Sequence, residues 1–124
     1  MYNLPMKGEL NMAYIKNIDH EKVLTLKEQI QVMPGQVVSR TLAQNEYVSV
    51  TLFAFAEGEE ISTHESIGDA MVTVLEGTGK YTVGGVEHFV NEGEVLVMPA
   101  NVPHAVYGQT DFKWMLTVVF PVEK

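Results

Sequence analysis

Short apolar runs with alternating polar positions follow one another along most of the chain. From Gln36 onward the runs QVVSRTL, EYVSVTLFAF, AMVTVLEG, GKYTV, VEHFV, EVLVMP, HAVY and FKWMLTVVFP are rich in Val, Thr, Phe and Tyr. Turn residues separate them, and the link Gly84–Gly85 is typical of a tight hairpin. Roughly eight short strands at regular turn spacing predict an all-β sandwich or barrel.

The last run is apolar on both of its faces. Because strand side chains alternate, Trp114, Leu116 and Val118 share one face, while Met115 and Val119 make the other face apolar as well. A strand that is buried on both faces needs cover on both. The N-terminal part of the chain or a second subunit would supply that cover, and we expect a homodimer.

The 124 residues, with 46% hydrophobic content, fit one domain with a substantial core. We expect residues 36–124 to form the barrel. Residues 1–35 would form an N-terminal extension with a strand or a short helix, packing on the barrel or on a partner. The segment NIDHEKVLTLKEQI fits both a helix beginning at Asp19 and a strand through Val23, and residues 1–12 fit poor order or packing along a neighbouring surface.

The charge balance removes several classes of partner. Acidic residues outnumber basic ones 16 to 8, and the net charge is −8. No basic stripe is available to neutralise phosphates, so we expect no nucleic acid and no anionic membrane surface as partner. The absence of cysteine excludes disulfides and thiolate ligands. No apolar run reaches transmembrane length, and we expect a soluble, cytoplasmic protein that binds a small molecule.

Two histidines stand within spaced patterns of glycine and proline. The first pattern reads GEEISTHESIGDAMVTVLEG from Gly58 and holds His64; the second reads GEVLVMPANVPHAVYG from Gly93 and holds His104. These patterns resemble the two motifs of the cupin superfamily, G-x5-H-x-H-x3-E-x6-G and G-x5-P-x-G-x2-H-x3-N. The resemblance spans residues 36–121. It implies the double-stranded β-helix, or jelly-roll barrel, of small single-domain RmlC-like cupins, which are often dimeric.

The sequence departs from the first motif at positions that would hold a metal. The resemblance places metal ligands at His64, Ser66, Ala70 and His104, and serine and alanine are not the histidine and glutamate of the motif. A stable zinc site takes three or four protein ligands, whereas two imidazoles leave most positions to water. We expect at most one weakly held divalent metal (Zn, Ni, Mn or Fe) at the two histidines, and otherwise no cofactor. Only a local bulge would turn Asp69 into the site.

Other side chains have both a binding and a structural interpretation. Ser66 fits a ligand-orienting hydroxyl and a small filler equally, and no acid is placed to make it a hydrolase nucleophile. Arg40, the only arginine, fits an anchor for a substrate carboxylate as well as an ordinary ion pair. Leu116 and Val118 are expected in the wall of a cavity shared with the two histidines.

Three functions stay open on this sequence. The first is binding of a small polar metabolite, sugar-like or a keto acid, with isomerase-like or lyase-like proton transfer. In that case one of His64 and His104 acts as the base and the other as the acid. The second is a divalent-metal-dependent enzyme such as an oxygenase, against which the missing ligands argue. The third is a non-catalytic ligand-binding module. The sequence leaves open whether the protein is an enzyme.

Overall fold

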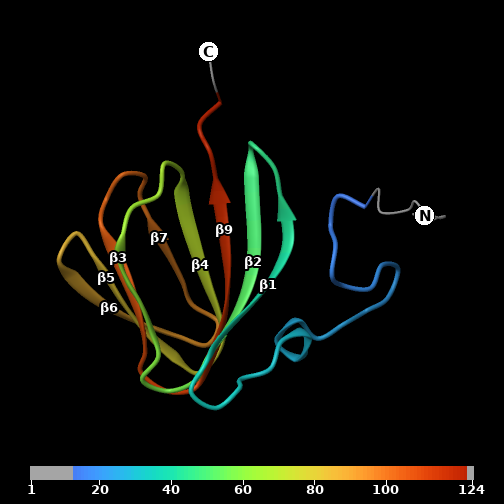
Figure 1. Ribbon diagram of the computed structural model, residues 1–124, viewed down its shortest axis with the longest axis horizontal. Coiled ribbons are helices and arrows are strands. Elements are labelled where there is room, and N and C mark those ends of the chain that lie inside the picture. Colours follow the sequence, from blue (N-terminus) through green and yellow to red (C-terminus); the bar gives the residue numbers. More distant parts are fainter. Residues whose placement is uncertain (1–12, 123–124) are drawn as a thin grey trace.

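The computed structural model describes residues 13–122 and consists of two antiparallel sheets that face each other (Figure 1). In chain order the elements are the 3-10 helix η1 (Leu26–Gln29) and the strands β1 (Val37–Gln44), β2 (Val48–Phe55), β3 (Glu60–His64), β4 (Asp69–Glu76), β5 (Thr78–Val83), β6 (Val86–Asn91), β7 (Val95–Met98), β8 (His104–Gly108) and β9 (Phe112–Val119). The five-stranded sheet has the order β1-β2-β9-β4-β7, and the four-stranded sheet has the order β3-β8-β5-β6. The prediction of an all-β double-stranded β-helix is confirmed.

Strand β3 is the element that the apolar runs did not reveal. Its sequence EISTH has a single apolar residue, Ile61, and the other four positions are exposed. It is an edge strand that pairs only with β8. An antiparallel strand with one face in water needs few apolar side chains, so the pattern of hydrophobic positions gives little sign of it.

Left-handed backbone positions shape two of the turns. Gly84 (φ 56°) and Gly85 (φ 83°) link β5 to β6 with Val83 opposite Val86, which confirms the predicted tight hairpin. Asn101 also lies in the left-handed region (φ 63°), at the position where the second cupin motif has glycine. Asparagine tolerates this conformation better than most residues, so the turn that leads into β8 is kept.

The main core fills the space between the two sheets. Its largest fully buried side chains are those of Trp114, Tyr81, Phe55, Phe112 and Met98. The aromatic rings pack in edge-to-face and stacked pairs, with the Trp114 ring 5.4 Å from Tyr81 and 6.1 Å from Phe112 between centroids. Such contacts stabilise the barrel beyond the area that they bury.

A second, smaller core lies on the outer face of the five-stranded sheet. Ile30, which follows η1, is buried there against Leu42 and Leu52. Lys113 is also buried on this face, and its Nζ donates a hydrogen bond to the carbonyl oxygen of Lys27 at 2.7 Å. The N-terminal segment therefore covers part of its own sheet, beside β1 and on the side of the molecule away from β6 (Figure 1).

Residues 17–30 adopt neither a helix beginning at Asp19 nor a strand through Val23. Between residue 13 and β1 the regular structure is limited to η1, whose N-cap Thr25 makes no side-chain capping hydrogen bond. A single helical turn is unstable alone, so packing on the sheet sets the path of this segment. Residues 1–12 lie outside the described residues. Within the described part no helix is long and apolar enough to cross a membrane.

Candidate functional site

Two histidines meet where β3 ends and β8 begins. His64 is the last residue of β3 and lies directly opposite His104, the first residue of β8. An irregularity in register between Ile61 and His64 sets this pairing. Strand β4 begins at the same end, and Asn101 N–H donates to the carbonyl of Ser66 at 2.7 Å, which ties the two adjoining loops together. We call this end of the barrel the histidine end.

Backbone carbonyls fix both imidazole rings. His64 Nδ1 is 2.9 Å from the carbonyl oxygen of Ser62, and His104 Nδ1 is 3.1 Å from that of Val102. The two Nε2 atoms lie 3.1 Å apart, and the rings are edge to face with centroids 4.3 Å apart. A carbonyl oxygen only accepts hydrogen bonds, so each Nδ1 carries a hydrogen, and in the neutral form of either ring the Nε2 atom then presents a lone pair.

If both rings were neutral, two lone pairs would face each other across 3.1 Å and repel each other, so a proton, a donor or a cation is required at this point. One proton shared by the two Nε2 atoms satisfies both rings, and so does a hydrogen-bond donor or a cation supplied by a ligand. Two nitrogen ligands about 2.1 Å from one metal and about 95° apart would also stand ~3.1 Å from each other. The pair is therefore an electron-rich contact for a proton, a polar ligand or a metal.

The two rings differ in their surroundings. His104 is 3% exposed, whereas His64 is exposed. Burial lowers the pKa of His104; the nearby charge of His64 lowers it further, and the hydrogen bond to Val102 and the charge of Glu65 oppose this. His104 is therefore the ring held neutral. Glu65 is a charged neighbour of His104 that the sequence reasoning missed, because β3 ends at His64 and strand alternation no longer says where the next side chain points.

The lowered pKa of His104 predicts a loss of stability on acidification. Below the ordinary histidine value of about 6.5 the unfolded chain takes up a proton that the folded chain resists until the pH reaches the lowered pKa. The stabilisation is complete above that window and falls as the pH drops through it. Urea unfolding of wild type and His104→Gln across this range should show a weaker pH dependence in the variant. A difference in stability that is independent of pH would contradict the assignment. The matched control is His20→Gln, because His20 is an exposed histidine in the N-terminal segment, away from the histidine pair.

The structure places the two altered motif positions differently. Ser66 lies beyond the end of β3, where its hydroxyl accepts the N–H of Gly68 at 3.2 Å. Ala70 is buried on β4, paired with Val118 and Met98. Strand alternation does not place Ser66 relative to His64, because the chain leaves the sheet at residue 64. Ser66 as a ligand contact stays a prediction.

The donor set does not fit a closed metal centre. Within residues 13–122 no three histidine or acidic side chains come together in a metal-binding group. Asp69 does not turn toward the histidines, since its Oδ1 accepts the N–H of Ala100 at 2.8 Å. In the part of the chain that the structure describes, only His64 and His104 fit a metal, as two neighbouring ligands. Any further ligands would have to come from water or from a bound molecule.

The predicted wall residues lie on the inner face of β9. Val118 is paired with Ala70 near the histidine end, and Leu116 is paired with Val72 one layer deeper. Both side chains pack with the main core. Their contact with a ligand stays a prediction.

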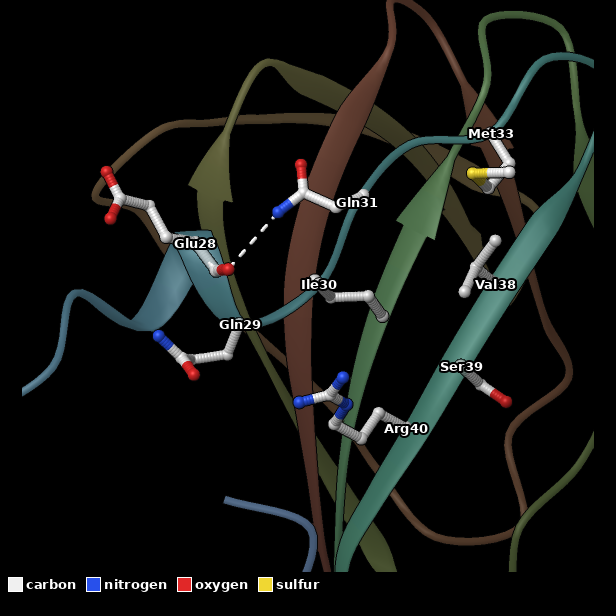
Figure 2. Close-up of a pocket in the computed structure, with 8 residues that line it drawn as sticks. All are labelled: Glu28, Gln29, Ile30, Gln31, Met33, Val38, Ser39 and Arg40. Carbon is white, nitrogen blue, oxygen red and sulfur yellow. Dashed lines mark hydrogen bonds between the residues drawn. The ribbon is translucent and has the colours of Figure 1, made fainter. Parts of the chain in front are cut away.

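Arg40 lies away from the histidine pair, on the outer side of the five-stranded sheet. It lines a groove of about 430 Å³ between β1 and the N-terminal segment, together with Gln29, Ile30 and Ser39. Figure 2 shows its side chain extending from β1 toward the segment that carries η1. Its Nη1 donates to the carbonyl oxygen of Asn17 at 3.2 Å. The predicted binding role of Arg40 can therefore apply to this groove and not to the barrel interior.

Comparison with known proteins agrees with the fold. A family profile described as "Cupin domain" matches residues 51–120. A conserved protein of unknown function from Streptococcus pyogenes, SPY1581, is 42% identical, with 91% of this chain and 99% of that chain covered and a TM-score of 0.88. A cupin superfamily protein from Desulfitobacterium hafniense is 33% identical, with 88% and 100% covered and a TM-score of 0.84. No curated protein matches the chain.

Proposed function

Because the chain belongs to the cupin family, we propose that it binds a small polar metabolite, sugar-like or a keto acid, at the histidine end of its barrel through His64 and His104. The observation that carries the proposal is the 3.1 Å separation of two Nε2 atoms whose rings are both fixed through Nδ1. A ligand hydroxyl can donate to one Nε2 while the proton on the other is donated to a ligand oxygen. Sugars carry both groups on adjacent carbons, whereas a keto acid offers neighbouring oxygens that accept the donated proton.

The same pair supports proton transfer on a bound carbonyl compound. His104 Nε2 is the base, because burial lowers the pKa of this ring and keeps it neutral. It would accept the proton from the carbon next to the carbonyl, while His64 Nε2–H gives its proton to the carbonyl oxygen, and an enol results. For a sugar, whose carbon next to the carbonyl bears a hydroxyl, His104 then gives its proton to the former carbonyl carbon while His64 takes the proton of that hydroxyl, and the new carbonyl completes an isomerisation. His64, the more exposed ring, meets the ligand first.

A metal held by the two histidines is the second candidate, favoured by the same 3.1 Å separation. Such a metal would polarise a ligand oxygen as a Lewis acid. Because the chain supplies only two ligands, a metabolite with two neighbouring oxygens would bind together with the metal more tightly than the metal alone. Ni²⁺ or Zn²⁺ titrations of wild type, with and without the metabolite, test this point.

Binding is tested with a panel of sugars, sugar acids and keto acids. Thermal shift selects the best ligand, and calorimetry then gives its Kd for wild type, His64→Ala, His104→Ala and the control His20→Ala. Loss of a hydrogen bond to a charged or buried partner costs about 2 kcal/mol, so either site variant should raise the Kd about 30-fold. The control should leave it unchanged. Wild-type affinity in both site variants, or no ligand in the whole panel, would contradict the proposal.

Deuterium exchange separates an enzyme from a binding module. If the histidine pair transfers protons, the bound keto acid or sugar should take up deuterium from D₂O at the carbon next to its carbonyl, and His104→Ala should stop the exchange. A ligand that binds at the pair and takes up no deuterium identifies a non-catalytic module.

A further inference from the structure

The groove that Arg40 lines has the size of a binding site for a small organic molecule. It lies between β1 and the N-terminal segment and has a volume of about 430 Å³. Val38 and Arg40 are two residues apart on β1, so both side chains are on the face that the N-terminal segment covers. Figure 2 shows the guanidinium of Arg40 and the side chain of Ile30 extending into the space between η1 and β1. A cation therefore stands beside an apolar floor.

The guanidinium of Arg40 has donors that the described part of the chain leaves open. Acidic residues outnumber basic ones 16 to 8, yet none of the ion pairs among the described residues includes Arg40. Its hydrogen bond to the carbonyl oxygen of Asn17 uses Nη1, one of three nitrogens that carry hydrogen. The other donors of Arg40 have no partner within residues 13–122 and are open to an anion.

The charges that line the groove favour a carboxylate as this anion. Arg40 is the one cationic side chain among the described residues of the lining, and Glu28 is the one acidic side chain. Figure 2 shows the carboxylate of Glu28 pointing away from Arg40. A single cation matches a singly charged ligand better than a doubly charged phosphate. The planar fork of a guanidinium also binds a carboxylate through two parallel hydrogen bonds.

The remaining surface of the groove suits an apolar chain. Ile30 is buried at its floor, Val38 is half-buried, and Met33 is 46% exposed. A hydrocarbon chain lying on these side chains would remove apolar surface of both the ligand and Met33 from water. The groove therefore offers one polar end and one apolar end to the same small molecule.

We propose that this groove is a second ligand site, separate from the histidine end, that binds a small monocarboxylate with an apolar chain. The carboxylate pairs with the guanidinium of Arg40, and the chain lies on Ile30, Val38 and Met33. Because β1 and the N-terminal segment form the groove together, the bound molecule also holds this segment against the sheet. The site uses none of the residues of the histidine pair, so the two proposals stand or fall independently.

Titration of the full chain with hexanoate, followed by ¹⁵N–¹H NMR, tests the site. Arg40 is the only arginine, so its Nε–H signal is identified without further assignment and should shift together with the backbone amides of Ile30 and Val38. Hexanoate should bind at least about tenfold more tightly than acetate, because its longer chain removes more CH₂ groups from water. Hexan-1-ol, which lacks the charge, should leave the Arg40 signal unshifted at the same concentration.

Variants of the groove separate binding from a structural role of Arg40. Arg40→Met should raise the Kd for hexanoate at least about tenfold, as expected for lost hydrogen bonds to a charged group. Lys22→Gln is the matched control, because it removes a cation outside the groove lining and should leave the Kd unchanged. Gln29→Glu is the second variant if loss of the contact with Asn17 disturbs the fold. It keeps Arg40, adds a carboxylate to the lining and should raise the Kd about fivefold.

Each outcome decides the proposal. Shifts at the groove that weaken in Arg40→Met or Gln29→Glu, and not in Lys22→Gln, support it. The absence of any shift at millimolar hexanoate overturns it, as does an unchanged Kd in both groove variants. Shifts that are confined to His64 and His104 also overturn it, because the carboxylate is then bound at the histidine end.

Discussion

Replacing Trp114 with alanine is expected to lower the free energy of unfolding by about 3–5 kcal/mol, because large aromatic side chains in a core leave a cavity that the surroundings fill only in part. The Trp114 ring stacks on Phe53 at 4.6 Å and lies 5.7 Å from Phe55 between centroids. Together with its contacts to Tyr81 and Phe112, the ring of Trp114 therefore connects aromatic side chains of both sheets. A loss of this size is a large share of the 5–15 kcal/mol that typically stabilises a domain.

Urea unfolding measures the effect, as a lower midpoint at an unchanged m-value. Trp114→Phe should cost much less, because it keeps a ring in place and removes an indole Nε1–H that has no hydrogen-bond partner among the described residues. Val23→Ala, at a fully exposed position, is the control and should change stability by less than about 0.5 kcal/mol. A loss below about 1 kcal/mol for Trp114→Ala would contradict the packing described here.

Restoring the two altered motif positions is expected to create a strong metal site. Ser66→His together with Ala70→Glu adds an imidazole and a carboxylate at the positions that the cupin motif uses. Metal binding to the folded state alone should then stabilise the double variant by about 2.7 kcal/mol at a hundredfold excess over Kd. Without metal the larger side chains should cost about 1–3 kcal/mol, since Ala70 is fully packed.

Melting temperature against Zn²⁺, Ni²⁺ or Mn²⁺ tests this prediction. The matched control is Ser66→His with Ala70→Gln, which has the same size and lacks the carboxylate, and its metal-dependent shift should be smaller. Wild type should gain least. If wild type already shows the largest shift, ligands other than His64 and His104 complete its site. The serine and alanine at positions 66 and 70 then do not weaken metal binding.

The fold could be predicted from the sequence because strand alternation, turn residues and motif spacing all indicate the same barrel. The Gly84–Gly85 hairpin shows this, since its φ angles demand glycine and the flanking strands alternate. Asn101 adopts a left-handed backbone conformation at the position where the second cupin motif has glycine. These features depend on residues that are close together in the sequence, and a single sequence shows such patterns directly.

The features that could not be predicted from the sequence depend on where a strand ends and on which strands pair. The polar strand β3 has almost no apolar signal, and its end at His64 makes strand parity useless for Glu65 and Ser66. The side of the sheet on which Arg40 lies depends on pairing with β2, which is a long-range contact. The fixing of both Nδ1 atoms by carbonyls likewise required the three-dimensional structure.

The most direct test of the central claim is the ¹⁵N NMR spectrum of the histidine side chains near pH 7, with His64→Ala and His104→Ala used for assignment. The claim is that His64 and His104 present paired Nε2 atoms to one ligand. Both rings should show a protonated Nδ1, and each Nε2 signal should shift when the partner ring is removed and when the ligand or Zn²⁺ is added. Two independent rings in the Nε2–H form, insensitive to each other and to the ligand, would contradict it.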